Sequence, residues 1–206
     1  GAVTTQTTLD INSGGTLTQN KKVIAGTSLD YDAGGALTIN ETIAATTVDI
    51  DALGVTTIAE AGDITASGAV TFGANKSGTL TTAGDITTSN DNVTFTKSMM
   101  QTGDVAIDTG AGAGNILFKS TVATGDKNLT LDAGSAGNIT AASSITGGGN
   151  LTVRDGAVQS YQALTVDSLN IQDATTSVTL GGAVTTQTTL DINSGGTLTQ
   201  NKKVIA

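Results

Sequence analysis

Apolar and polar residues alternate in short runs along the whole chain, and the clearest runs end at Asn or Asp followed by glycine. Examples are Leu9–Ile11, Leu29–Tyr31 and Val48–Ile50. Alternation over so few residues is typical of half-buried strands, and no segment keeps the 3.6-residue spacing of an amphipathic helix. The pattern therefore predicts an all-β chain of short strands separated by tight turns.

The runs recur about every 20 residues, which indicates a repeat architecture. One strand can be followed along the chain through Leu9, Leu29, Val48, Val70, Ile86, Val105, Leu129, Leu151, Leu169 and Leu190. At the fifth position Val93 would serve as well as Ile86. Coils of this length are too short for helical repeats, so we expect a parallel β-helix, or β-solenoid, with nine coils per 181-residue period.

Stacked coils would bury alternate residues in a continuous interior ladder, because successive side chains of a strand point to opposite faces. Nine coils about 4.8 Å apart would be roughly 43 Å long. The predicted core ladder includes Leu9, Ile11, Leu29, Tyr31, Val48, Ile50, Leu190 and Ile192.

A second repeat operates on a longer scale, since residues 1–25 recur without a change as residues 182–206. We interpret residues 1–206 as a single continuous solenoid fragment. Residues 1–181 form one long repeat, and residues 182–206 begin the next. The parent protein is expected to be an array of such repeats.

Composition restricts the function further. The net charge of -9 and the pI of about 4.1 argue against nucleic acid as a partner, because phosphate binding needs clustered Lys and Arg. No apolar run reaches the ~20 residues of a membrane-spanning helix. The chain has no His and no Cys, so the commonest general base and nucleophile are missing, and its only arginine is Arg154. We therefore expect neither an enzyme nor a membrane span.

Several strand units resemble the filamentous-haemagglutinin-like and autotransporter-like repeats of very large bacterial surface proteins. The units that carry this resemblance are Asn115–Phe118, Asn128–Gly134, Gly137–Thr140 and Gly149–Val153. The resemblance implies a right-handed parallel β-helix, export to the bacterial cell surface or the extracellular space, and a role in adhesion, matrix or filaments.

Acidic residues alternate with the apolar ladder and would stack on the outside of the solenoid. One column would contain Asp10, Asp30 and Asp49, and a second would contain Asn12, Asp32 and Asp51. Calcium, which takes oxygen ligands, could bridge such carboxylates between coils. The alternative, which we favour, is a solvated acidic face, because no calcium-binding nonapeptide is present.

Three other polar features have structural interpretations that we prefer. Thr7, Thr27 and Thr46 align as an ice-binding column would, yet threonine is common in strands. The glycine runs 110–114 and 147–149 lack the Gly-Lys-Ser/Thr ending of phosphate loops and are expected to be turns. The pairs Lys21–Lys22 and Lys202–Lys203 are expected to discourage side-to-side aggregation.

The function that this pattern favours is mechanical: an extracellular filament, matrix fibre or adhesin stalk whose partners are further copies of itself, stacked end to end. The alternative is an adhesin binding module that presents one face to glycans or host surfaces. For ring stacking on sugars it would have only Tyr31, Tyr161, Phe72, Phe95 and Phe118. A carbohydrate-active enzyme is a third class, and its cleft is not evident in coils without long loops.

Overall fold

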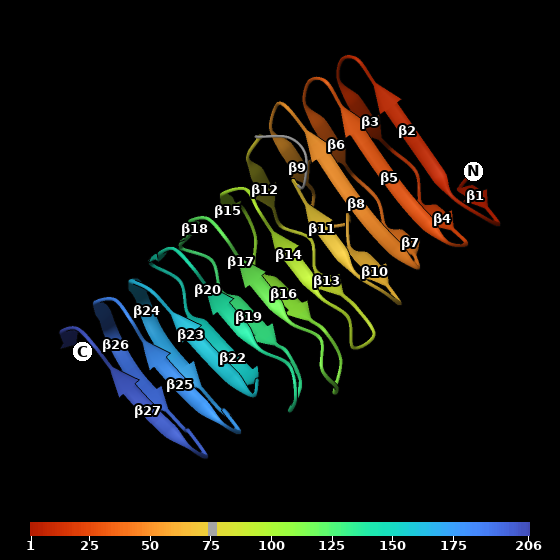
Figure 1. Cartoon of the computed structure of the whole chain (residues 1–206). Coiled ribbons are helices and arrows are strands. Elements are labelled where there is room, and N and C mark those ends of the chain that lie inside the picture. The colour runs from red at the N-terminus through yellow and green to blue at the C-terminus, as the bar shows by residue number, and fades with distance from the viewer. Residues whose placement is uncertain (74–77) are drawn as a thin grey trace.

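The alternating runs form short parallel strands that wind into one solenoid. The structure is a computed structural model, and it describes residues 1–73 and 78–206. Coils stack along one axis, with the two termini at opposite ends (Figure 1). Leu9 pairs in parallel with Leu29 in the next coil, which confirms the predicted all-β parallel solenoid. None of the described residues belongs to a helix that could cross a membrane.

The coils contribute strands to three stacks, called ladders I, II and III in the order in which the chain visits them. Ladder II is a separate ten-stranded sheet, so the solenoid has about ten turns. Its strands are β2 (Leu9–Ser13), β5 (Ser28–Ala33), β8 (Thr47–Ala52), β11 (Val70–Phe72), β14 (Val93–Phe95), β17 (Ile116–Phe118), β20 (Ile139–Ala141), β23 (Val158–Tyr161), β25 (Ser177–Leu180) and β27 (Thr197–Gln200).

Ladders I and III together form a second sheet of 18 strands. Ladder I starts with β1 (Val3–Thr5), β4 (Val23–Ala25), β7 (Ile43–Ala45), β10 (Ile64–Ala66), β13 (Ile86–Thr87), β16 (Val105–Asp108), β19 (Leu129–Asp132) and β22 (Leu151–Asp155). Ladder III starts with β3 (Leu17–Gln19), β6 (Leu37–Ile39), β9 (Thr56–Ile58), β12 (Leu80–Thr82), β15 (Met99–Gln101), β18 (Val122–Gly125) and β21 (Ile145–Gly147), and it ends with β28 (Val204–Ile205).

Two long strands, β24 (Leu164–Ile171) and β26 (Val184–Ile192), join ladders III and I at the C-terminal end. Leu164 of β24 pairs with Ile145 in ladder III, whereas Leu169 of the same strand pairs with Leu151 in ladder I. The first part of each long strand therefore belongs to ladder III, and its second part belongs to ladder I.

The interior is a predominantly apolar core, as the alternation predicts. Leu29, Tyr31, Val48 and Ile50 are almost completely buried, while Leu9 and Ile11 in the first coil are partly buried. Phe72, Phe95 and Phe118 stack face to face through the middle of ladder II, with ring centroids 5.0 and 4.8 Å apart. Each stacked pair stabilises the fold by about 0.5–1.5 kcal/mol, in addition to the stabilisation from burying the rings.

The strand series predicted from Leu9 is correct as far as Val70 and then changes ladder. Val70 pairs with Val93, and the stack continues to Ile116, so Val93 and not Ile86 is the fifth member. Ile86 lies in ladder I, as do the later members of the predicted series, Val105, Leu129, Leu151, Leu169 and Leu190. The sequence could not separate the ladders because each has the same alternation of apolar and polar positions.

This change of ladder also alters the count of coils and the place of two predicted core residues. Nine turns of ladder II run from Leu9 to Leu198, and Leu190 lies one strand short of that point. The 181-residue period therefore corresponds to eight and two-thirds turns instead of nine. Leu190 and Ile192 do pack against the core, partly buried, but in ladder I and not in the ladder of Leu9 and Ile11.

Candidate functional site

The predicted acidic columns do stack on the outer face of ladder II. Asp10 pairs with Asp30 and Asp30 with Asp49, while Asn12 pairs with Asp32 and Asp32 with Asp51. We call these six side chains the acidic stack. Exposure falls along it, from exposed Asp10 to Asp51, which is only 2% exposed.

Burial and repulsion by like charges raise the pKa of Asp49 in the acidic stack. The pKa of Asp49 rises from 3.8 to about 6, first because the carboxyl is partly buried and then because Asp51 and Asp30 carry the same charge. Asp49 Oδ1 is buried and makes no hydrogen bond to any described residue. Burial is thus the main cause of the shift at Asp49, and like charges on the same strand and on the preceding coil add to it.

Lys97, which lies two coils after β8, places a positive charge near Asp49 and Asp51, at the buried end of the acidic stack. Lys97, which follows β14, is 6% exposed, and its chain runs so close to Gly73 that a β-carbon there would collide with Lys97 Cε. Burial lowers the pKa of the Lys97 amine, and the charges of Asp51 and Asp49 oppose that change. Lys97 Nζ is buried and makes no hydrogen bond to any described residue, so attraction to Asp51 and Asp49 only partly offsets the cost of burying its charge.

The calcium prediction gains no support from the arrangement of acidic side chains. In residues 1–73 and 78–206, no group of three or more acidic residues is placed so that it could hold a metal ion. Asn12 Nδ2 lies 3.5 Å from Asp32 Oδ2, so one neighbour in the stack is an amide donor.

Asparagines that precede the strands form a second outer column, the asparagine ladder of Asn92, Asn115 and Asn138. Asn92 Oδ1 accepts from the Asn115 backbone N–H at 2.9 Å and from Asn115 Nδ2 at 2.8 Å. Asn115 Oδ1 accepts from the Asn138 backbone N–H at 2.9 Å. Each side chain therefore caps the start of the next strand in ladder II.

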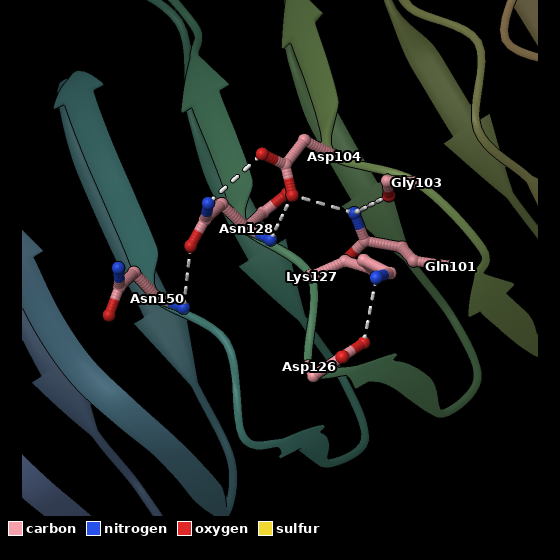
Figure 2. Close-up of polar contacts among 7 residues, drawn as sticks. All are labelled: Gln101, Gly103, Asp104, Asp126, Lys127, Asn128 and Asn150. Atoms are coloured by element: carbon pink, nitrogen blue, oxygen red, sulfur yellow. Dashed lines mark hydrogen bonds and ion pairs between the residues drawn. The ribbon is translucent and has the colours of Figure 1, made fainter.

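A similar column precedes ladder I and is drawn in Figure 2. The carboxylate of Asp104 accepts from the backbone N–H and the side-chain amide of Asn128 at 2.8 and 3.0 Å, and Asn128 Oδ1 accepts from the Asn150 N–H at 3.2 Å. These bonds, led by the backbone one, lower the pKa of Asp104. The sequence contained a signal for both columns, an Asn or Asp directly before an apolar strand, but its role was not predicted.

Inward-facing glutamines close the corners between ladders III and I. Gln101 Nε2 donates to the backbone carbonyl of Asn128 at 3.0 Å, and Gln19 Nε2 donates to that of Glu41 at 2.8 Å. Both bonds tie one coil to the next. Gln101 thus adds a second bond to the Asn128 carbonyl, which also accepts from the Val105 backbone N–H at 3.0 Å.

Threonine columns exist, although none is continuous. Thr7, Thr27 and Thr46 stack as predicted and are exposed, but the column ends at Gly68, which donates its N–H to the Thr46 carbonyl. A longer column on the outer face of ladder III, which sequence reasoning missed, is interrupted by two apolar residues; it runs Thr18, Thr38, Thr57, Thr81, Met100, Ala123, Thr146, Thr165 and Thr185. Neither column forms the regular hydroxyl array expected for ice binding.

The remaining candidates lie at corners or on the surface. Gly110 has a φ of 83° and donates to Asp108 Oδ1 at 2.7 Å, so the first glycine run is a turn, as predicted. Gly147 ends β21, and the second run forms the corner before β22. The pairs Lys21–Lys22 and Lys202–Lys203 are exposed, as is Arg154.

The aromatic rings are inside the solenoid. Tyr31, Tyr161, Phe72, Phe95 and Phe118, which are all the aromatic residues of the chain, are each no more than 1% exposed. Burial raises the pKa of Tyr31 to about 12. The surface therefore offers no ring on which a sugar could stack.

Comparison with family models, with curated proteins and with solved structures finds no match to this chain. The β-solenoid architecture therefore rests on the strand pairing and burial described above.

Proposed function

We propose that this chain is part of a stiff extracellular rod, in which tandem 181-residue copies stack end to end as a bacterial filament, matrix fibre or adhesin stalk. One observation carries the proposal: identical residues 1–25 and 182–206 form coils of the same solenoid at its two ends. The same 25-residue segment forms coils at both ends of the solenoid, so one copy could follow another in a continuous array. The resemblance to filamentous-haemagglutinin-like repeats supports an extracellular location.

The working parts of such a rod are its backbone pairing, its interior ladder and its outer amide columns, and no residue is assigned a catalytic role. Val3 in the first coil is 45% exposed, whereas its duplicate Val184, with a coil on either side, is fully buried. Each further copy would bury its interior side chains in this way. Stacking then stabilises every coil through its two neighbours.

The binding-module alternative has less support. Protein surfaces that bind sugars commonly use exposed aromatic rings, and all five rings of this chain are buried. A glycan-binding face would have to rely on threonine, asparagine and carboxylate side chains alone.

The test is electron microscopy of proteins with one, two and four tandem copies of residues 1–181. The proposal predicts unbranched rods that lengthen by about 42 Å per copy, from strands about 4.8 Å apart. Compact particles whose length does not follow copy number would contradict it. A matched set with Ile50→Asp in each copy controls for length that does not depend on an intact core.

A further inference from the structure

We infer that successive copies in such an array are rotated by one ladder, a third of a turn, so that every surface feature recurs on three sides of the rod. The inference rests on the proposed tandem array, but its basis is the strand register within this chain. The two identical segments do not occupy the same ladders.

The register is clearest at the acidic end of each segment. Leu9 lies in ladder II and pairs with Leu29, whereas its duplicate Leu190 lies in ladder I and pairs with Leu169. The residues that follow them, Asp10 and Asp191, therefore point from different sides of the solenoid.

The rest of the segment shifts in the same sense. Leu17 lies in ladder III beside Leu37, and its duplicate Leu198 lies in ladder II beside Val178. Each duplicate occupies the ladder that the chain visits just before the ladder of the original. The shift is uniform, so the whole segment is rotated and no single strand has slipped.

Local structure moves with the sequence to the new corner. Gln19 Nε2 donates to the Lys21 carbonyl at 3.0 Å at the corner between ladders III and I. Gln200 Nε2 makes the same bond to the Lys202 carbonyl, also at 3.0 Å, at the corner between ladders II and III. The segment thus encodes its own turn and only requires an alternating apolar interior, which all three ladders provide.

The repeat length converts this shift into a symmetry. A period of eight and two-thirds turns rotates each copy back by one ladder, and three copies return to the starting orientation after 26 turns, about 125 Å along the rod. Lys21–Lys22 and Lys202–Lys203 already lie at different corners. An array would therefore present its acidic stack and its lysine pair on all three sides, with no unique face.

Pairs of introduced cysteines test the register in the chain as it stands, since it has no native cysteine. Asp191 is beside Asn170 in ladder I, whereas an unrotated segment would place it beside Thr179 in ladder II. We expect a short bifunctional thiol reagent to cross-link N170C/D191C and not T179C/D191C. The positive control is T152C/N170C, one turn earlier in ladder I. The reverse result, or cross-linking of the control alone, would overturn the inference.

Cryo-electron microscopy of a multi-copy array tests the symmetry. The inference predicts a rotation of a third of a turn per copy, in addition to any gradual twist of the solenoid. As a matched control, adding the segment Leu9–Thr16 at each junction supplies one more strand and corner, and should make successive copies face the same way. Rods without the rotation would refute the inference and leave the proposed function intact. Absence of rods would refute the proposed function, and the cysteine pairs would still decide the register.

Discussion

The acidic stack and the asparagine ladder are both outer columns of ladder II. They differ in how their stacked polar side chains are paired. In the asparagine ladder, Asn115 donates to Asn92 and accepts from Asn138, so the column satisfies itself. In the acidic stack, Asp30 and Asp49 are like charges on adjacent coils. The pKa of Asp49 is raised to about 6, and buried Lys97 lies near its inner end.

The difference follows from the side chains themselves. An amide has both a donor and an acceptor, so identical amides can pair coil after coil, whereas an ionised carboxylate only accepts. A column of carboxylates therefore needs cations or donors from elsewhere. Columns of amides can extend along an array of any length, but columns of carboxylates are limited by their counter-ions.

The largest effect is expected when a carboxylate is moved from the outer face of β8 to its inner face. Ile50 is fully buried between outward-facing Asp49 and Asp51, and Ile50→Asp should cost more than about 3 kcal/mol because the buried charge has no partner. Hydrogen exchange should show loss of protection in the coils around β8. Thr71→Asp, which extends the outer column by one coil, is the control and should cost far less.

Removal of the buried charge of Lys97 should have the next largest effect. Lys97→Met keeps the length of the buried chain and removes its charge. Because burial lowers the pKa of the Lys97 amine by more than Asp51 and Asp49 raise it, the folded protein disfavours the charged form, so we expect the free energy of unfolding at pH 7.5 to rise by about 1–2 kcal/mol. Exposed Lys119, one coil further on, is the matched control, and Lys119→Met should change stability by less than about 0.5 kcal/mol. A fall in stability in urea unfolding would contradict this, because it would mean that attraction to Asp51 and Asp49 outweighs the cost of burying the charge.

Interruption of the asparagine ladder should lower stability by a similar amount. Asn115→Ala removes the side-chain bond to Asn92 and the acceptor for the Asn138 N–H, for a loss of about 1–2 kcal/mol. Asn115→Asp keeps the acceptor and should be intermediate at low pH in the same unfolding assay. If Asn115→Ala were neutral, the column would be an exposed row with no part in stability.

The smallest effect should be a gain in stability when the charge of Asp49 is removed. Because the folded-state pKa of Asp49 is raised, the folded protein binds its proton more tightly than the unfolded chain, and stability falls as pH rises from 3.8 towards about 6. Asp49→Asn removes this loss, so we expect about 1 kcal/mol more stability at pH 7.5 and a flatter pH profile. An unchanged pH profile in the Asp49→Asn protein would contradict the assignment to Asp49.

The sequence predicts the coil and the outward direction of side chains better than it predicts the ladder. Alternation identified buried Leu29, Val48 and Ile50 and exposed Asp10, because it reports which face of a strand each residue occupies. It could not decide between Ile86 and Val93, since all three ladders repeat the same alternation. Lys97 was also missed, because its approach to Asp49 and Asp51 crosses two coils and has no periodic signal.

Fibre diffraction from aligned four-copy arrays tests the central claim most directly, that coils stack along the axis of a rod. The account predicts a strong meridional reflection at about 4.8 Å, with strands perpendicular to the rod axis. The same reflection on the equator, or none at all, would contradict it, because the strands would then not stack along the rod.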